Sequence, residues 1–440
     1  MSFPRYPTYK DSGVEWLGEV PEHWAVLPLK KSFQIVGGST PKSENESFWD
    51  GNILWATPSD LSKRESIYMN DTQRKITAAG LASCGASLVP AASIILSTRA
   101  PIGSLAIAET ETCTNQGCKS LVPSERANTE YFAHLLSISS TELNIRGKGT
   151  TFLEISGDEL GAFKTPVPPR GEQTLIATFL DRETAKIDGL VAEQRRLMAL
   201  LKEKRQAVIS HAVTRGLNPD APMKPSGIEW IGDVPGHWDV TPLKYVVNLR
   251  SGGTPSKTNL AYWNGDVPWA SSKDLKVEAL SDTQDHITQS AVDDGAADLV
   301  PAGTLLIVVR GMILIHTFPV VKTLVPMAIN QDLKALTPSV KLNVDFLAWL
   351  LRGASPETLG RIDEAAHGTK VLRIDAWTSM ALPIPPFDEQ LEIVRSIIDD
   401  MSKFDTLTAE AQRAIDLLQE RRTALISAAV TGQIDVRKPA

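Results

Sequence analysis

The stretch SGVEWLGEVP at residues 12–21 recurs as SGIEWIGDVP at residues 226–235, with three conservative changes and an offset of 214 residues. A repeat this long exceeds the units of a solenoid protein, which span about 20 to 50 residues. It therefore indicates a duplicated domain, and two like domains in one chain predict pseudo-twofold geometry. The same offset pairs eight of the ten tryptophans, namely Trp16 with Trp230, Trp24 with Trp238, Trp49 with Trp263, and Trp55 with Trp269.

The duplication continues past this first segment with small insertions. The later matches are Thr40-Pro41 with Thr254-Pro255, Val89-Pro90-Ala91 with Val300-Pro301-Ala302, Arg99 with Arg310, Asn115-Gln116 with Asn330-Gln331, and Gly149-Thr150 with Gly368-Thr369. The two halves therefore correspond over nearly their whole length.

Composition is that of an ordinary soluble globular protein, with 440 residues, 42% hydrophobic and 22% charged. Three cysteines, Cys84, Cys113 and Cys118, show neither Cys-x-x-Cys spacing nor nearby histidines, so neither a disulfide framework nor a zinc site is expected. The first residues lack an apolar signal core, and no stretch reaches the roughly 18 apolar residues of a membrane span. We expect a soluble, cytoplasmic protein without membrane contact.

The net charge of −7 and the isoelectric point near 5.6 provide no global electrostatic argument for nucleic-acid binding. Neutralising phosphates requires a basic face. Any such face must therefore be local.

Each half begins with about 165 residues that alternate short strands and turns. Residues 93–98 and 304–309 are apolar strand patterns that follow a Val-Pro-Ala turn, and residues 131–136 and 346–351 show helical patterns. Each domain is therefore predicted to be mixed α and β. Each ends at a proline cluster, Pro166-Val167-Pro168-Pro169 or Pro383-Ile384-Pro385-Pro386, which favours extended backbone and marks a boundary.

After each proline cluster comes Glu-Gln, at 172–173 and 389–390, and then about 40 residues without proline. This pattern predicts one long helix per half, roughly 60 Å long at 1.5 Å per residue. A heptad row runs through Leu180, Ile187, Gln194, Leu201 and Val208, and in the same register through Ile397, Phe404, Ala411, Leu418 and Leu425; a companion row is predicted at Leu190 and Leu197, and at Leu407 and Ala414. Ordinary core helices are the alternative, but the length and the shared register favour a coiled coil.

The repeated Ser-Gly-x-Glu-Trp-x-Gly-x-x-Pro-x-His-Trp segment, the duplicated strand-rich domain and the Pro-Pro-x-x-Glu-Gln entry into a long helix resemble the specificity subunit of Type I restriction-modification systems. The resemblance covers nearly the whole chain. It implies an α+β fold of two tandem, similar target-recognition domains, each followed by a long helix, with the helices paired as an antiparallel coiled coil. The expected organisation is a first recognition domain at 1–171, a first helix at 172–215, a second recognition domain at 216–388, a second helix at 389–432 and a tail at 433–440.

The resemblance also implies a function. Each recognition domain would read one half of a bipartite target in double-stranded DNA, and the helices would fix the spacing. Since faces of a duplex recur about every 34 to 36 Å, two domains on such a spacer could enter the major groove about one turn apart. Because the halves are similar but unequal, we expect two different half-sites that flank unread base pairs.

The same resemblance implies partners for this chain. These are two DNA methyltransferase subunits and then motor-endonuclease subunits. S-adenosylmethionine is expected in the methyltransferase partner, and no cofactor is expected on this chain. Charged helix positions that could dock these partners, or simply be solvated, include Glu193, Arg195, Arg196, Lys202, Arg205, Glu410, Arg413, Glu420 and Arg422.

Two segments approach known catalytic or nucleotide-binding motifs without matching them. Gly252-Gly253-Thr254-Pro255-Ser256-Lys257-Thr258 has serine where a phosphate loop needs glycine, and its proline interrupts the run of amides. Ile384-Pro385-Pro386-Phe387 resembles the Asn/Asp-Pro-Pro-aromatic motif of adenine N6-methyltransferases, but isoleucine cannot bond the target amino group. We therefore expect no catalytic residues, no metal ligands and no chemistry by this chain alone.

Candidate DNA contacts are polar residues predicted to lie in turns, since base reading uses Arg, Lys, Asn, Gln, Ser and Thr while phosphate contacts position the protein. In the first domain they are Thr40, Lys42, Ser59, Lys63, Arg64, Arg74, Lys75, Arg99, Asn115, Gln116, Lys148, Thr150 and Thr151. In the second they are Thr254, Ser256, Lys257, Ser271, Ser272, Lys273, His286, Arg310, Asn330, Gln331, His367, Thr369 and Lys370.

Positions shared by both halves are better candidates for phosphate contact or folding, while half-specific ones such as Arg64, Arg74, His286 and Lys370 are better candidates for reading sequence. Arg99 and Arg310 could also cap a sheet edge. The Asn-Gln pairs could simply satisfy a turn. The paired tryptophans are predicted to belong to the core rather than to stack on bases.

Two other functions are compatible with parts of the sequence. A coiled-coil scaffold that binds only protein would suit the acidic net charge. A self-sufficient methyltransferase would need cofactor and base-gripping motifs, including a Gly-x-Gly-x-x-Gly fingerprint, which the chain lacks.

Overall fold

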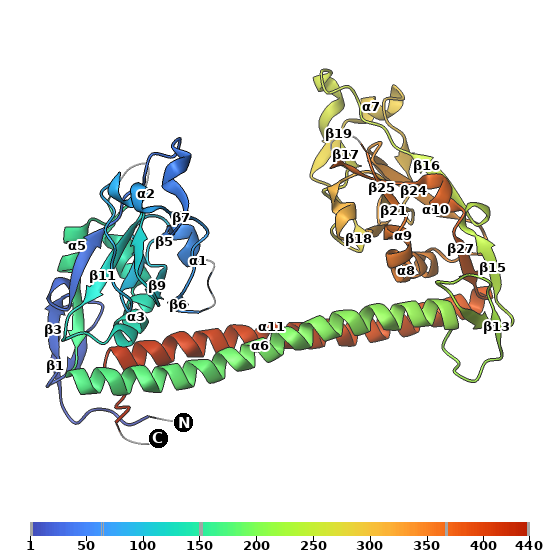
Figure 1. Cartoon of the computed structure of the whole chain (residues 1–440). Coiled ribbons are helices and arrows are strands. Elements are labelled where there is room, and N and C mark those ends of the chain that lie inside the picture. The colour runs from blue at the N-terminus through green and yellow to red at the C-terminus, as the bar shows by residue number, and fades with distance from the viewer. Residues whose placement is uncertain (1–2, 63, 65, 149–152, 366–367, 438–440) are drawn as a thin grey trace. The chain divides into compact units, whose positions relative to one another are not determined.

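The computed structural model describes residues 3–62, 64, 66–148, 153–365 and 368–437. The chain divides into two compact units, one of residues 1–195 with 412–440 and one of residues 196–411. Each unit joins one strand-rich domain to half of each long helix (Figure 1).

The main sheet of each strand-rich domain has five strands in the same order, so the duplication seen in the sequence is also a duplication of topology. In the first unit the order is β4 (Phe33–Gly37), β11 (Cys118–Pro123), β8 (Ile94–Ser97), β9 (Leu105–Ala108) and β6 (Tyr68–Met69). In the second it is β16 (Val247–Ser251), β24 (Leu333–Pro338), β21 (Leu305–Val308), β22 (Val320–Thr323) and β18 (Ala279–Leu280). The strands predicted at 93–98 and 304–309 are confirmed as β8 and β21, all of whose residues are buried.

A smaller sheet lies beside each main sheet. In the first unit it contains β10 (Thr112–Thr114), β5 (Trp49–Ala56) and β7 (Lys75–Ile76); in the second, β19 (Asp285–Ile287), β17 (Trp263–Ala270), β23 (Met327–Ile329) and β20 (Leu299–Val300). Trp49 and Trp55 cross edge to face at 5.1 Å and 81°, and Trp263 and Trp269 repeat this at 5.2 Å and 82°. These paired tryptophans pack on each other as a small satellite core.

Two-stranded ribbons and short helices complete the two domains. The ribbons pair β1 (Tyr9–Asp11) with β2 (Glu19–Pro21), β3 (Ala25–Pro28) with β12 (Lys164–Val167), β13 (Met223–Pro225) with β14 (Asp233–Pro235), β15 (Asp239–Pro242) with β27 (Ala381–Ile384), and β25 (Ile362–Glu364) with β26 (Lys370–Leu372). The short helices are α1 (Pro58–Ser62), α2 (Ala78–Ala82), α4 (Ser140–Arg146), α5 (Gly157–Ala162), α7 (Gln289–Asp293), α9 (Ser355–Leu359) and α10 (Ile374–Thr378).

The helices predicted at 131–136 and 346–351 are confirmed as α3 (Thr129–Ile138) and α8 (Val344–Gly353), and each joins its domain to the long helices. From α3, His134 bonds Asp181 at 2.9 Å and the buried Tyr131 hydroxyl donates to the Val430 carbonyl at 3.0 Å. Beneath α8, the Gln206 amide donates to the carbonyls of Arg352 and Gly353, each at 3.2 Å.

The long helices are α6 (Arg170–Arg215) and α11 (Phe387–Val430), and they pack together with opposite directions. The same interhelical ion pair occurs in each unit. Arg422 of α11 bonds Asp188 of α6 at 2.9 Å in the first unit, and Arg205 of α6 bonds Asp405 of α11 in the second. Because both pairs are related by the same 217-residue offset, the helix contacts follow the pseudo-twofold duplication. Arg205 and Arg422 therefore contact the partner helix.

The first heptad row is buried or half-buried along its length, from Leu180 and Ile187 to Leu201 and Val208, and from Ile397 and Phe404 to Leu418 and Leu425. The predicted companion row was wrong at Leu190, Leu197 and Leu407, which are 52%, 43% and 45% exposed. Its fourth member, Ala414, is half-buried. The inward companions come four residues after the first row, at Thr184, Val191, Met198, Arg205 and Ala212 and at Met401, Thr408, Ile415, Arg422 and Ala429. A pattern of leucines does not reveal this row, because several of its members are polar by residue type. The methyl group of Thr and the methylene groups of Arg nevertheless cover apolar surface.

The Glu-Gln pair after each proline cluster lies in the first turn of the long helix, and its glutamine bonds the helix to the domain. Gln173 donates to the Arg126 carbonyl at 3.0 Å and the Pro168 carbonyl at 2.9 Å, while its oxygen accepts from the Asn128 amide at 2.8 Å. Gln390 makes the same three contacts with Lys341, Pro385 and Asn343 at 3.0, 2.9 and 2.8 Å. Both glutamines are buried with their amide groups satisfied, so the signature has a structural role.

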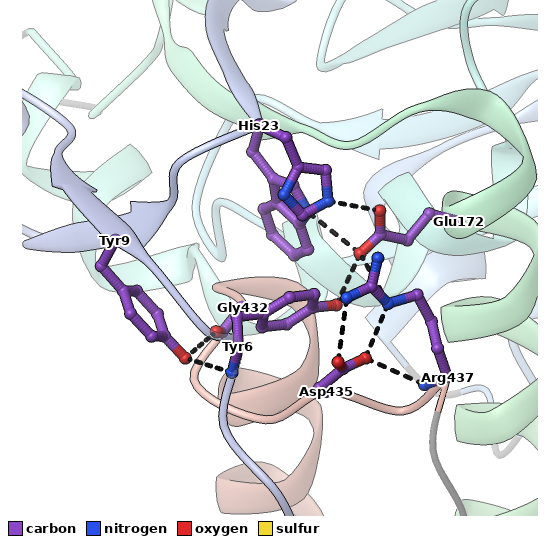
Figure 2. Close-up of polar contacts among 8 residues, drawn as sticks. Tyr6, Tyr9, His23, Glu172, Gly432, Asp435 and Arg437 are labelled. Carbon is purple, nitrogen blue, oxygen red and sulfur yellow. Dashed lines mark hydrogen bonds and ion pairs between the residues drawn. The ribbon is translucent and has the colours of Figure 1, made fainter.

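Glu172 brings the two ends of the described chain together in the first unit (Figure 2). Its carboxylate is 7% exposed; it accepts from the Tyr6 hydroxyl at 2.6 Å and from Trp24 Nε1 at 3.1 Å, and contacts His23 Nε2 at 2.8 Å. Burial and the bond to Glu172 raise the pKa of Tyr6 above its ordinary range. Arg437 approaches the same carboxylate at 4.0 Å.

The segment after α11 is itself anchored beside this cluster. The buried Asp435 carboxylate accepts from Arg437 Nε at 2.8 Å and from Nη2 at 2.9 Å, and the Asp435 amide donates to the Pro4 carbonyl at 2.7 Å. The second unit has a simpler arrangement. There Glu389 contacts His237 at 2.7 Å, and Trp238 Nε1 is buried without a hydrogen-bond partner among the described residues.

Candidate nucleic-acid interface

Three loops meet at one edge of each main sheet. Strands β4 and β8 both run antiparallel to β11, so the ends of β4 and β8 lie beside the start of β11. The loops at this edge carry Thr40 after β4, Arg99 after β8 and Gln116 before β11. Strands β16, β21 and β24 place Thr254, Arg310 and Gln331 in the same way. We call these two groups of loops the first and second loop edges.

A direct contact ties two loops together at each loop edge. The Thr40 hydroxyl donates to the Gln116 side-chain oxygen, and Thr254 donates to Gln331 in the same manner. The backbone comes close enough here to require glycine, because a Cβ at Gly38 would lie 2.1 Å from the Asn115 carbonyl oxygen. The Gly-Gly turns therefore serve loop packing.

Arg99 and Arg310 occupy matching backbone positions with different neighbours. The Ile155 amide donates to the Thr98 carbonyl at 3.0 Å, and the Leu372 amide donates to the Val309 carbonyl at 2.9 Å. The adjacent residues therefore face each other as bridge pairs, Arg99 with Glu154 and Arg310 with Val371. Arg99 Nε donates to Glu154 Oε2 at 2.9 Å, whereas the exposed Arg310 has no ion pair among the described residues.

Most of the other cationic candidates are held by a nearby acid. The pairs are Lys75 with Asp71, Lys148 with Glu159, Lys273 with Asp285, His286 with Asp282, and Lys370 with Glu364. Hydrogen bonds from the lysines lower the pKa of Asp71, Glu159 and Glu364, and the Thr283 amide followed by His286 lowers that of Asp282. The charge of these five candidates is therefore compensated, in keeping with the acidic net charge of the chain.

A few cations lack a carboxylate partner in the part of the chain that the structure describes. Lys42 and Lys257 are exposed on the loops after β4 and β16. The Arg74 guanidinium carbon lies over the Trp49 ring, 3.5 Å from its centroid. Lys119 and Lys334, at the start of β11 and β24, are additional half-buried cations at the loop edges; they lie in strands, outside the turns in which DNA contacts are predicted. Lys334 bonds the Ser251 hydroxyl.

A small hollow of about 300 Å³ lies between α1 and the loop before β7, lined by Ser59, Asp60, Arg64, Asp71, Thr72 and Gln73. Arg64 Nη2 donates to the Tyr68 carbonyl at 2.7 Å, and its buried Nε has no partner among the described residues. The Ser59 hydroxyl contacts Thr57 at 2.8 Å. Two candidate DNA contacts, Ser59 and Arg64, thus line one cavity.

Several other candidates hold local turns. Asn115 and Asn330 accept from the amides of Gly117 and Asp332 two residues on, at 2.9 and 3.1 Å. The buried Ser271 donates to Asp274 at 3.0 Å, and Ser256 contacts Thr258 at 2.8 Å. Ser272 and Thr369 are half-buried. Lys63, Thr150, Thr151 and His367 lie outside the described residues.

Glu154 is the functional candidate that sequence reasoning missed, because the predicted DNA contacts include no acidic residue. Its place opposite Arg99 depends on pairing between residues 55 positions apart, which no local pattern reveals. Within the described ranges, no group of three or more His, Cys, Asp or Glu side chains could hold a metal ion. None of the described helices is long and apolar enough to cross a membrane.

Comparison with known proteins adds independent evidence. The model of the Type I restriction modification DNA specificity domain matches residues 21–195 and again residues 235–417. The specificity subunit of the Type I restriction enzyme MjaIX from Methanocaldococcus jannaschii is 28% identical over 285 residues, which cover 63% of this chain and 64% of that protein. The EcoR124I/EcoR124II specificity subunit of Escherichia coli is 30% identical over 251 residues, 55% of each chain. The chain therefore spans less than two thirds of the length of these relatives.

Solved structures share the fold. A chain from a study of complex assembly and conformational transition of the type I R-M system superposes with a TM-score of 0.72 at 15% identity, covering 93% of this chain and 98% of that chain. The HsdS subunit from Thermoanaerobacter tengcongensis gives 0.52 at 16% identity, covering 94% and 98%. Since the family model matches both halves and most of the sequence, the chain belongs to the Type I restriction modification DNA specificity family.

Proposed function

We propose that this chain is the non-catalytic specificity subunit of a Type I restriction-modification complex. Each recognition domain reads one half of a bipartite, asymmetric DNA target. The long helices set the spacing between the half-sites and dock methyltransferase subunits. The restriction subunits join the same complex, and S-adenosylmethionine binds the methyltransferase partner rather than this chain.

The observation that carries this proposal is the duplicated loop edge. The scaffold is the same in both units, with the same strand order and the same Thr-Gln contact. The side chains presented on it differ, as Glu154 and Val371 do beside their arginines. A common frame with different polar side chains is suited to reading two different short sequences by hydrogen bonds to base edges.

The ion pairs of Lys75, Lys148, Lys273, His286 and Lys370 support a division of labour. A cation held by a carboxylate releases few counterions on binding a phosphate, so it adds little sequence-independent affinity. The specificity subunit then supplies discrimination, and the methyltransferase subunits supply much of the backbone contact. This division fits a chain with a net charge of −7.

The docking role of the helices is supported by their exposed leucines. Leu190 of α6 corresponds to Leu407 of α11, and Leu200 corresponds to Leu417, each with the 217-residue offset. All four side chains are exposed. Apolar side chains repeated at matched surface positions are suited to binding two copies of the same partner, one for each half.

The direct test is co-expression with a methyltransferase subunit of this family, followed by genome-wide mapping of methylated adenines. A split motif with two unlike halves is expected. The isolated chain should methylate nothing. Sequence-selective, salt-sensitive DNA binding by the complex separates this proposal from a protein-only scaffold, which would show neither.

The spacer role has its own test. Deleting one heptad from each helix keeps the seam in register and shortens each by about 10 Å. Since base pairs are about 3.4 Å apart, the unread spacer should shorten by about three base pairs. The matched control is Leu197→Gln, an exposed change that leaves helix length unaltered. A spacer of unchanged length in the shortened protein would refute this role.

A further inference from the structure

We infer that Glu154 is a positioning residue that makes Arg99 a guanine reader, while the matching Arg310 contacts phosphate. This inference rests on the proposed function, since it assigns different tasks to one shared position of the two recognition domains. It also reverses the expectation that shared positions serve the same role in both halves.

The first step is the way in which Glu154 holds the guanidinium. Its carboxylate accepts from Nε of Arg99 at 2.9 Å. Among the described residues, no hydrogen bond engages either terminal nitrogen of Arg99. Arginine presents five N–H groups in a planar fork. A partner at Nε leaves the outer edge, with one N–H from each terminal nitrogen, open for a pair of parallel hydrogen bonds.

The second step is that Glu154 is itself fixed. Its amide donates to the Lys148 carbonyl at 3.1 Å, and its carbonyl accepts from the Lys148 amide at 2.9 Å. On the other side, the neighbouring Ile155 amide bonds Thr98 at 3.0 Å. The Arg99 carbonyl is held by the Ser97 hydroxyl at 2.7 Å. Both members of the pair therefore project from anchored backbone, so little ordering is left to occur on binding.

The third step concerns charge. Glu154 offsets the charge of Arg99, which weakens its attraction to a phosphate while leaving the hydrogen-bond geometry of the fork intact. Guanine presents two acceptors, O6 and N7, on its major-groove edge, and these suit the outer edge of an arginine fork. An oriented, charge-compensated arginine is thus better suited to guanine than to phosphate.

Arg310 has the opposite properties. Its bridge partner is Val371, it is exposed, and no carboxylate of the described residues lies within ion-pairing distance. Its full charge and unrestrained side chain suit a phosphate contact, which positions the protein without reading sequence.

The experiment uses the complex with the methyltransferase partner and gives Arg99 the environment that Arg310 has. The variants are Glu154→Val, which copies the second unit, Glu154→Gln, which retains an oxygen for Nε, and Arg310→Ala. Two quantities are measured for each: base preference at every target position by methylation mapping, and DNA affinity as a function of salt. Melting temperatures check that Glu154→Val remains folded, and the nearly isosteric glutamine variant keeps the test valid if it does not.

We expect Glu154→Val to reduce the preference for guanine at one position of one half-site by about tenfold or more. The other half-site should be unaffected, and the slope of log affinity against log salt should steepen by about one because Arg99 becomes free for phosphate. Glu154→Gln should keep most of the preference. Arg310→Ala should weaken binding to all sequences alike and reduce the salt slope by about one.

An unchanged preference at every position in Glu154→Val would overturn the inference, as would equal relaxation in the glutamine and valine variants. A loss of base preference in Arg310→Ala would also overturn it. If the wild-type complex itself shows no sequence-selective methylation, the proposed function fails instead, so the two failures are distinguishable.

Discussion

The Tyr6 hydroxyl donates to Glu172 at 2.6 Å across 166 residues of sequence, and it does so inside a cluster that also engages Trp24 and His23. The second unit has no comparable cluster, since Glu389 contacts His237 alone among the described residues. Glu172 therefore has more polar partners than Glu389 has at the matching position of the duplicated fold.

We expect Glu172→Ala to destabilise the first unit by about 2 to 4 kcal/mol, because it leaves buried donors of Tyr6 and Trp24 without an acceptor. The matched change Glu389→Ala should cost less than about 1 kcal/mol, since its one partner is exposed. Urea unfolding of the full chain, with hydrogen exchange to locate the affected unit, measures both. Equal losses would show that the cluster contributes nothing beyond the shared contact.

The Tyr6 phenol also predicts a pH dependence. Its pKa is raised by burial and then by Glu172, while in the unfolded chain it ionises near pH 10. Its contribution to stability is therefore complete below about pH 10 and is lost as pH rises above it, because only the unfolded state releases the proton there. Tyr6→Phe should flatten part of the alkaline loss of stability seen in urea titrations between pH 9 and about 11. Tyr245→Phe, at an exposed position, is the control and should leave the curve unchanged.

Neighbouring positions of α6 test the corrected helix seam. Ile187 is 5% exposed and Leu190 is 52% exposed. Ile187→Ala should cost about 2 to 4 kcal/mol through the loss of buried methylenes, while Leu190→Ala should cost less than about 0.5 kcal/mol. Chemical denaturation compares them. A larger loss at Leu190 would restore the companion row that the leucine pattern first suggested.

The three cysteines differ in accessibility. Burial raises the pKa of Cys113 and of Cys118 to about 12, and both side chains lie in the interior. Cys84 is partly exposed. Native protein treated with a thiol-specific reagent at pH 8 should therefore be labelled at Cys84 first, with Cys113 and Cys118 protected until unfolding. Mass spectrometry of the labelled peptides gives the result, and early labelling at Cys113 or Cys118 would contradict it.

The sequence predicted the fold well where the signal is repeated. The repeat itself, the strands at 93–98 and 304–309 and the two helix entries after the proline clusters all recur in both halves, and the structure contains them. A pattern that occurs in both halves is supported twice, so it is less readily a chance arrangement of residues than a pattern that occurs once.

The helix seam shows why periodicity alone was insufficient. The first heptad row was correct, but large leucines such as Leu190 drew the second row to the wrong side. The inward position is instead filled by residues such as Thr184 and Arg205, which pack with their methyl or methylene groups and satisfy their polar ends nearby. Residue type therefore predicted the seven-residue spacing of the seam but placed its second row on the wrong face of the helix.

The interface shows a different limit. Arg99 was identified as a candidate, but its partner Glu154 depends on a backbone bridge between distant loops. The difference between Arg99 and Arg310 was invisible because the arginines themselves are the same. The two arginines differ in the residue that each one faces, which is Glu154 for Arg99 and Val371 for Arg310. The pairing of distant loops places these residues opposite the arginines.

The discontinuous make-up of the first unit imposes an order on biosynthesis. The second unit is one uninterrupted stretch, residues 196–411, whereas the first needs residues 412–440 in addition to residues 1–195. A ribosome therefore finishes the second unit while the first still lacks α11's last turns and Arg437. The domain made first is completed last, and until then the side of α3 that later meets the Val430 carbonyl is open to chaperones and to neighbouring nascent chains.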